Sequence, residues 1–230
     1  MVSLGILLPL IGTTIGSLFV FFFKSKFIDK VSPSLFSMAA GVMFAASIWS
    51  LLLPSLELAN SFVIPSIGFI VGVLFLKLLN NYNDSNHLFF SITLHNIPEG
   101  IAVGVIFASF LTGSTTYLSA FLLSLGIAIQ NIPEGAIISL PMRCLGNSKC
   151  KSFLYGFASG VVEPIFSVLS IIFFSIANGI LPFCYGFAAG AMIFVCIDEL
   201  IPDSRNKSSY ASYFFIFGFL IMMILDVFFG

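Results

Sequence analysis

The sequence predicts an all-α polytopic membrane protein with eight transmembrane helices. Three observations predict this fold class: the composition, the long apolar runs and the distribution of basic residues. Of the 230 residues, 59% are hydrophobic and 8% are charged, whereas a soluble domain carries about 25% charged residues. Too few polar side chains are present to cover a water-soluble globule, and the net charge of −1 offers no basic surface to nucleic acid. The composition therefore excludes a soluble enzyme and a nucleic-acid-binding protein.

Eight apolar runs follow one another along the chain, separated by short polar segments. Their lengths approach the about 20 residues that cross a bilayer as a helix, and their continuous apolarity indicates helices and not barrel strands. The predicted spans are Leu4–Phe23, Leu35–Pro54, Phe62–Leu79, Leu88–Leu111, Tyr117–Pro141, Phe153–Ala177, Ile180–Pro202 and Tyr213–Gly230. We expect the first span to be retained, because no small-residue cleavage site follows it.

The nine basic residues fall in alternate connections between the spans. They are Lys24, Lys26 and Lys30 around the first connection, Lys77 at the start of the third, Arg143, Lys149 and Lys151 in the fifth, and Arg205 and Lys207 in the seventh. The second (Ser55–Ser61), fourth (Thr112–Thr116) and sixth (Asn178–Gly179) connections contain none. The positive-inside rule places the basic connections in the cytoplasm and both termini on the extracytoplasmic side. We expect the plasma membrane as the location.

Two pairs of spans repeat a sequence pattern. LHNIPEGIAVGV, from Leu94, and IQNIPEGAIISL, from Ile129, share the five residues NIPEG. AAGVMFAASIWSLLLP, from Ala39, resembles AAGAMIFVCIDELIP, from Ala188. Because the members of each pair cross the membrane in opposite directions, these are inverted repeats. Such repeats are typical of transporters that bind their substrate near the bilayer midplane.

Polar side chains recur at helical spacing inside the NIPEG spans. His95 and Glu99 lie four residues apart, which places them on one helix face. Gln130 and Glu134 repeat this spacing, Asn96 and Asn131 occupy matching neighbouring positions, and Glu163 lies within the following span. The prolines inside the two NIPEG motifs weaken the helix locally and release the carbonyl groups four residues earlier as further oxygen ligands.

Three acidic residues, Glu99, Glu134 and Glu163, fall well inside predicted spans. Each costs about 3 kcal/mol at the bilayer centre, even on a lenient insertion scale, and every Lys and Arg lies at the flank. The carboxylates are therefore expected to be protonated or to hold a cation. With one imidazole and three amides nearby, the mixed nitrogen and oxygen donors suit zinc and its first-row neighbours. The alternative is a structural role, in which these groups cap a kink or bridge helices; two NIPEG copies and a third buried acid favour the metal site.

On these motifs the chain resembles the ZIP (Zrt/Irt-like) family of divalent metal transporters, and its second and seventh spans resemble the GufA-like branch. The resemblance implies a single transporter domain over residues 1–230, with helices arranged as three, two and three. It also implies a binuclear site. One metal would be held by His95, Glu99, Gln130 and Glu134 with Met43 nearby, and the other by Asn96, Asn131 and Glu163, with Glu99 and Glu134 bridging. Relatives often carry an acidic residue where Asn131 stands, and many have a long His-rich loop where this chain has only Asn80–His87.

Weaker candidates line the ends of a transport path. They are Asp198 and Glu199 at the cytoplasmic end, Glu57 at the outer mouth and Asp226 in the last span. A solvated flank is the alternative for Asp198, Glu199 and Glu57, a helix-end anchor is the alternative for Asp226, and Asp203 is expected to be a solvated loop charge. Cys144 and Cys150 are expected to be reduced thiols, with a metal-gathering pair as the alternative.

The leading hypothesis is a secondary carrier that moves zinc, with iron, manganese and cadmium as further candidates, into the cytoplasm. It is not an enzyme, and no cofactor is expected beyond the transported metal. The partners expected are divalent ions, the lipid bilayer and a second copy of the chain, since small-residue faces such as Gly156/Gly160 permit a homodimer. No nucleotide-binding loop is present, so nucleotide is not expected. The alternatives are a metal-selective channel or proton-coupled exchanger, an intramembrane metalloprotease, which lacks its second helical histidine here, and a scaffold, which leaves three buried acids unexplained.

Overall fold

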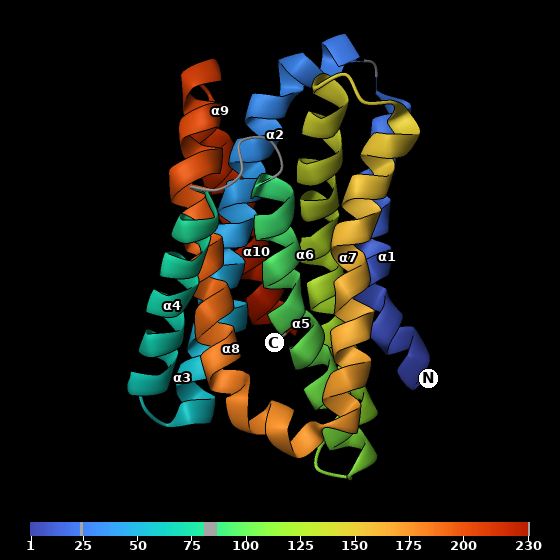
Figure 1. Cartoon of the computed structure of the whole chain (residues 1–230), viewed down its shortest axis with the longest axis vertical. Coiled ribbons are helices and arrows are strands. Elements are labelled where there is room, and N and C mark those ends of the chain that lie inside the picture. Colours follow the sequence, from blue (N-terminus) through green and yellow to red (C-terminus); the bar gives the residue numbers. More distant parts are fainter. Residues whose placement is uncertain (24, 81–86, 230) are drawn as a thin grey trace.

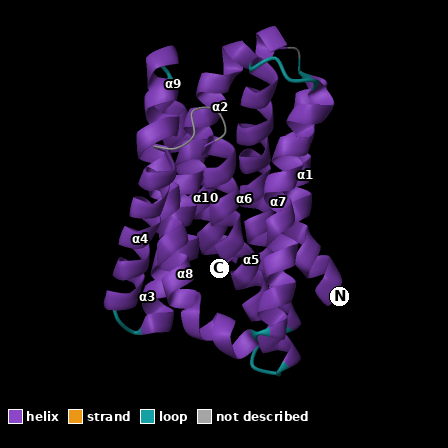
Figure 2. Cartoon of the chain, viewed as in Figure 1, coloured by secondary structure: helices purple, strands orange, loops and turns teal. Residues whose placement is uncertain are grey.

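The structure is a computed structural model that describes residues 1–23, 25–80 and 87–229, with the backbone alone at 25–29, 79–80, 87–88, 90–92, 94–95 and 229. These residues form helices joined by short turns, and no strand occurs among them (Figure 2). The helices run mostly along one direction as a bundle (Figure 1). The predicted all-α fold class is confirmed.

The helices differ in length. Their bounds are α1 Val2–Phe22, α2 Ser25–Ala46, α3 Leu53–Ala59, α4 Val63–Asn80, α5 His87–Leu111, α6 Tyr117–Cys144, α7 Lys149–Ile172, α8 Phe174–Val195, α9 Ile201–Lys207 and α10 Ala211–Phe229. Within the described part of the chain, six continuous helical segments are long and apolar enough to cross a membrane. Two of these segments, Lys30–Ala59 and Phe174–Lys207, join neighbouring helices. Shorter apolar helices lie at Val63–Leu78 and Asn96–Leu111. These helices are those of a polytopic membrane protein.

The predicted connection at Thr112–Thr116 is confirmed, but the predicted position of the sixth connection is wrong. The sequence places it at Asn178–Gly179, whereas α7 and α8 are separated only by Phe173, whose backbone is not helical. From there α8 runs obliquely across the lower end of the bundle before it turns upward (Figure 1). Asn178 and Gly179 are exposed inside this first part of α8. Both are weak helix formers that a surface helix tolerates, so the dip in apolarity marks an exposed helical segment and not a turn.

Two π-helical turns interrupt the repeated spans at corresponding places. Ser47–Leu52 joins α2 to α3, and Cys196–Leu200 joins α8 to α9. Each turn is followed directly by a proline in the first turn of the next helix, Pro54 or Pro202. Because proline cannot donate to the helical ladder and π-turns widen it, the two spans share a local distortion that matches their sequence repeat. By contrast, α5 and α6 continue as helices through the prolines of the NIPEG motifs.

Close backbone approaches at glycines pair the outer helices, α2 with α10 and α8 with α4. A methyl group in place of hydrogen at Gly41 or Gly218 would come 2.0 Å from a carbonyl oxygen of the partner helix. The corresponding distances are 2.1 Å at Gly72 and 2.2 Å at Gly190. Small residues allow membrane helices to pack closely, and both pairs use the same device. Spans two and eight therefore pack together as spans seven and three do.

The helix α1 packs along α6 by the same means. A methyl group at Gly12 or Gly16 would lie 1.9 Å from a carbonyl oxygen of α6. Pro9 of α1 cannot supply a helical N–H to the carbonyl of Gly5, and Ser124 Oγ of α6 donates to that carbonyl at 2.5 Å. A second tight pair, α5 with α7, stands beside α1 and α6. These four helices form one half of the bundle, and α2, α4, α8 and α10 form the other.

The face formed by Gly156 and Gly160 packs against α1 of the same chain. A methyl group at Gly156 would come 2.1 Å from Ser17 Oγ, and one at Gly160 would come 2.8 Å from Thr13 Cβ. The expectation that this face serves a homodimer is wrong, because α1 of the same chain covers it. The homodimer itself stays a prediction.

Basic residues gather at one end of the bundle. Lys30 lies near the start of α2, Lys77 near the end of α4, Arg143 in the last turn of α6, Lys149 and Lys151 in the first turn of α7, and Arg205 and Lys207 in the last turn of α9. All these helix ends lie in the upper half of Figure 1, away from the N-terminus. The segregation predicted along the sequence is thus a segregation in space.

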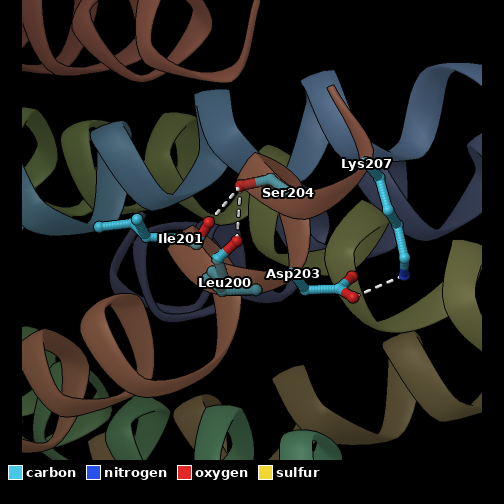
Figure 3. Close-up of polar contacts among 5 residues, drawn as sticks. All are labelled: Leu200, Ile201, Asp203, Ser204 and Lys207. Atoms are coloured by element: carbon cyan, nitrogen blue, oxygen red, sulfur yellow. Dashed lines mark hydrogen bonds and ion pairs between the residues drawn. The ribbon is translucent and has the colours of Figure 1, made fainter. Parts of the chain in front are cut away.

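Asp203 does not lie in a loop as predicted, because α9 extends through it to Lys207. Its carboxylate pairs with Lys207 Nζ, one turn later, at 2.5 Å (Figure 3). In the same turn, Ser204 Oγ lies 2.7 Å from the carbonyl oxygen of Leu200 and 3.1 Å from that of Ile201. Asp203 remains exposed and takes no part in the buried site.

Candidate metal-transport site

Six of the predicted site residues lie in three neighbouring helices, and all are buried. They are Asn96 and Glu99 of α5, Gln130, Asn131 and Glu134 of α6, and Glu163 of α7, each at most 2% exposed. Glycine brings two of these helices together at the level of the carboxylates, since a methyl group at Gly100 would lie 2.5 Å from the carbonyl oxygen of Glu163. The residue that follows Glu99 in the NIPEG motif thus sets the approach of α5 to α7.

Hydrogen bonds between helices hold part of the side chains of Asn96, Gln130 and Glu99. Asn96 Nδ2 donates to the carbonyl oxygen of Ser159 in α7 at 3.0 Å. Gln130 Nε2 donates to Glu99 Oε1 at 2.5 Å, which joins α6 to α5. The two amide groups therefore donate hydrogen bonds to neighbouring helices, and their oxygen atoms accept none from the described residues.

Several buried polar atoms have no hydrogen-bond partner among the described residues. They are Asn96 Oδ1, Glu99 Oε2, Gln130 Oε1, Asn131 Oδ1 and Nδ2, and Glu163 Oε2. Each such atom costs about 1–3 kcal/mol if nothing compensates it. All but one are oxygens, which are acceptors, so the group they lack is a donor or a cation.

The acidic residues of the site form one electrostatic cluster. Glu99 interacts with Glu134 and with Glu163, and Glu163 interacts with Glu134. The described Lys and Arg residues lie near helix ends, whereas the three acids lie well inside their helices. A divalent cation bound among the three carboxylates would balance these like charges.

Amide groups accompany the carboxylates in these three helices. Among the residues that the structure describes, His, Cys, Asp and Glu form no group of three or more that could hold a metal ion. Carboxylate and amide oxygens bind a broad range of divalent cations, so they do not select zinc by themselves.

Two predicted ligands stand apart from this description. The backbone of His95 lies in α5 one turn before Glu99, but its side chain lies outside the described residues. Met43 of α2 is fully buried, in the main apolar core that also contains Ala102 of α5 and Ile137 of α6. Met43 therefore shares this apolar core with α5 and α6, and its helix α2 packs against α6.

A cavity of about 370 Å³ reaches the site. Buried Glu99 and Gln130 line it, together with exposed Glu57 in α3. Its walls also include Trp49, Ser50 and Leu51 of the first π-turn, Tyr185 of α8 and Asp226 of α10. The helix α3 lies at the lower end of Figure 1, opposite the basic end. The site is therefore open toward the end that the positive-inside rule places outside the cytoplasm.

Asp226 contributes a half-buried carboxylate to this cavity. Its Oδ1 accepts a hydrogen bond from Ser50 Oγ, and its Oδ2 has no hydrogen-bond partner among the described residues. The contact ties α10 to the first π-turn. Asp226 and Glu57 thus lie in one cavity with Glu99, as a transport path requires.

Asp198 and Glu199 lie in the second π-turn. Asp198 is exposed and Glu199 is half-buried, and neither lines the cavity that reaches the site. Asp198 and Glu199 therefore do not share the cavity that Glu99 and Gln130 line. Cys144 and Cys150 are exposed at the basic end and form no disulfide in the described part of the chain.

Sequence reasoning missed three residues that the structure brings to the site or its cavity. Thr13 of α1 donates a hydrogen bond to Glu163, Ser50 donates to Asp226, and Tyr185 lines the cavity beside Glu99. Only Thr13 left a signal in the sequence: it lies between two glycines in the run GTTIG of an otherwise apolar span. Ser50 and Tyr185 carry no pattern that distinguishes them from packing residues.

Several known proteins are similar in sequence to this chain. Residues 77–226 match the family described as ZIP Zinc transporter. The relative named Zinc transporter ZIP11 in Xenopus tropicalis is 34% identical over an alignment that covers 97% of this chain and 96% of the relative. Zinc transporter ZIP11 of Homo sapiens is 46% identical over 61% of this chain and 42% of its own length, and Zinc transporter GufA of Myxococcus xanthus is 32% identical over 61% and 54%. The chain thus aligns with about half the length of the human and bacterial relatives.

The family match covers more than half of the chain, and the frog relative aligns with nearly all of it. The long apolar helices agree with a transporter family that resides in membranes. This multi-pass membrane protein belongs to the ZIP family of zinc transporters.

Proposed function

We propose that this protein is a secondary transporter that carries zinc across the membrane into the cytoplasm through the site between α5, α6 and α7. One observation carries the proposal: buried carboxylate and amide oxygens without hydrogen-bond partners in the described structure gather there. A divalent cation supplies the positive charge that these atoms lack. The printed names of the relatives, which are zinc transporters, favour zinc. Iron, manganese and cadmium are further substrates to test.

The proposed site holds two ions. One is bound by His95, Glu99, Gln130 and Glu134 with Met43 nearby, and the other by Asn96, Asn131 and Glu163, with Glu99 and Glu134 shared. The unused oxygens of Asn96, Gln130 and Glu163 support this division. Asn131 contributes a neutral oxygen, which binds a cation less strongly than a carboxylate does.

Zinc enters from the end that carries Glu57 and Asp226 and leaves at the basic end, past Asp198 and Glu199. The cavity that links exposed Glu57 to buried Glu99 supports the entry half of this route. The concentration of Lys and Arg at the opposite end supports the cytoplasmic assignment of that end and extracytoplasmic termini. We take the membrane to be the plasma membrane.

The chain works as a single domain of eight transmembrane helices over residues 1–230, in a three, two and three arrangement. The paired packing of spans two and eight and of spans seven and three supports the inverted repeat, as do the matching π-turns. The protein catalyses no reaction, and the metal is its substrate and not a resident cofactor. No nucleotide drives the movement.

Uptake of radioactive zinc into vesicles that contain the purified protein tests this function. Glu99→Gln keeps the shape of the side chain and removes its charge, so we expect the variant to fold and to transport no zinc above protein-free vesicles. Asp203→Asn removes a carboxylate that takes no part in the buried site, so this variant is the matched control and should retain most of the uptake. Competition with iron, manganese and cadmium then ranks the substrates.

The same vesicles separate a carrier from the alternatives. A metal-selective channel would not saturate at low zinc concentration, and a proton-coupled exchanger would change the internal pH as zinc enters. If Glu99→Gln transports zinc like the unmodified protein, the site assignment is overturned.

A further inference from the structure

A fourth helix reaches the acidic cluster. Thr13 lies in the middle of α1 and is fully buried. Its Oγ1 donates a hydrogen bond to Glu163 Oε1 at 3.3 Å, while Glu163 Oε2 has no hydrogen-bond partner in the described residues. One oxygen of this carboxylate is thus held by α1, and the other remains available.

Two glycines fix the position of Thr13 from different sides. A methyl group at Gly160 of α7 would come 2.8 Å from Thr13 Cβ, and one at Gly135 of α6 would come 2.0 Å from the carbonyl oxygen of Thr13. Gly160 precedes Glu163 by three residues, which places both on one face of α7. The same glycine that admits α1 therefore lies one turn from the carboxylate that α1 contacts.

The hydroxyl of Thr13 has one proton and two acceptors within reach. Oγ1 lies 3.2 Å from the carbonyl oxygen of Pro9, one turn earlier in α1. An ionised carboxylate is the stronger acceptor, because a hydrogen bond to a charged group is roughly twice as strong as one between neutral groups. When Glu163 is ionised, as a metal ligand must be, the Thr13 hydroxyl donates to Glu163 in preference to the carbonyl oxygen of Pro9.

The neighbouring residue shows what a threonine does here without such a partner. Thr14 Oγ1 donates to the carbonyl oxygen of Leu10 at 2.6 Å, within α1, and Thr14 is only half-buried. Threonine in an apolar helix commonly bonds back to its own backbone in this way. Thr13 also lies within hydrogen-bond distance of the carbonyl oxygen four residues earlier, and it differs from Thr14 in its additional contact with a carboxylate on another helix.

We propose that Thr13 is a positioning residue that holds the Glu163 carboxylate so that Oε2 is presented to the transported cation. This inference rests on the proposed function, because it takes Glu163 as a ligand of one of the two ions. Partners that orient a ligand in this way typically change metal affinity 10–100-fold when they are removed. For a single neutral hydroxyl we expect the lower end of that range.

Equilibrium dialysis of the purified full chain against zinc, followed by metal counting, tests the inference. Thr13→Val has the same shape without the hydroxyl and should weaken binding of one of the two zinc ions about tenfold. Thr13→Ser restores the hydroxyl and should bind like the unmodified protein. Thr14→Val removes a hydroxyl from the next position of α1 and is the matched control, for which we expect no change.

A double variant separates positioning from packing. In a Glu163→Gln background, which should bind one zinc ion, Thr13→Val should cause no further loss, because the group that it positions is already absent. If Thr13→Val binds both ions normally, or weakens binding equally with and without Glu163, the inference is overturned. Should the valine variant not fold, Thr13→Ala takes its place under the same criteria.

Failure of the proposed function gives a different result. In that case the unmodified protein binds no zinc, or Glu163→Gln leaves the number of bound ions unchanged. Either result overturns the site itself, whereas two ions falling to one in Glu163→Gln with a normal Thr13→Val variant overturns the role of Thr13 alone.

Discussion

Asn96 and Gln130 show how single residues would orient oxygen ligands in the proposed metal site. Each amide donates from nitrogen to a neighbouring helix, and each keeps an oxygen without a partner in the described structure. Glu163 follows the same scheme with one oxygen on Thr13. Oriented oxygens of this kind lower the cost of ordering the ligands when the cation binds.

The pH of the outer solution should change zinc uptake in one direction. Carboxylates must be deprotonated to bind a metal, so protons and zinc compete for Glu99, Glu134 and Glu163. Protonation increases as pH falls, and we therefore expect the KM for zinc to rise from neutral to mildly acidic outer pH. Initial uptake rates over a range of zinc concentrations, measured at several outer pH values with the internal pH fixed, give this KM. A KM that is independent of pH would contradict competition at these carboxylates.

Glycines bring several helix pairs of this protein into close backbone contact. Gly12, Gly16 and Gly135 bring the backbones of α1 and α6 into contact, and Gly100 does the same for α5 and α7. Membrane helices cannot rely on the expulsion of water between them and depend on close packing instead. The approach of α1 to α6 also sets the position of Thr13, so helix packing and the site are built from the same residues.

Alanine at Gly135 should destabilise the protein, because its methyl group would come 2.0 Å from a backbone oxygen of α1 that cannot move alone. Overpacking of this kind costs about 1–3 kcal/mol. Gly126 lies in the same helix with no atom within 4 Å of an added methyl group, so Gly126→Ala is the matched control. It should be neutral or stabilising by up to about 1 kcal/mol. Thermal unfolding of both variants in detergent measures the difference, and equal stabilities would show that α1 and α6 do not pack as described.

The whole molecule has two chemically different ends. Basic residues lie at one end, and the cavity that reaches Glu99 opens toward the other. On the proposed route, a cation meets acidic and hydroxyl groups first and approaches the lysines and arginines only beyond the buried site. This polarity belongs to the assembled bundle, since the basic end and the lining of the cavity are each built from several helices.

Native cysteines can test which end faces the cytoplasm. Cys144 and Cys150 are exposed at the basic end, whereas Cys196 is buried and Cys184 is half-buried. A membrane-impermeant maleimide should therefore not label Cys144 and Cys150 in intact cells, but should label them in inside-out vesicles. Ser61→Cys, in the exposed connection between α3 and α4, is the control and should show the reverse. Labelling of Cys144 and Cys150 in intact cells would invert the proposed orientation.

Several features of this protein could be predicted without its structure, because their causes are local. A bilayer requires about 20 apolar residues for each spanning helix, so the helices around Glu99 and Glu134 and the connection at Thr112–Thr116 were predictable from composition. The duplicated NIPEG motif marked most of the acidic and amide residues of the site. The prediction of the sixth connection was wrong because Asn178 and Gly179 lower the local apolarity without ending the helix.

Contacts between distant segments were decided only by the tertiary structure. Thr13 lies 150 residues from Glu163 along the chain, and Ser50 meets Asp226 only because α10 packs beside the π-turn. The cavity, too, exists only where α3, α6, α8 and α10 converge. The physical reason is that burial in lipid constrains each helix separately, whereas a hydrogen bond between helices depends on which glycines permit two backbones to approach.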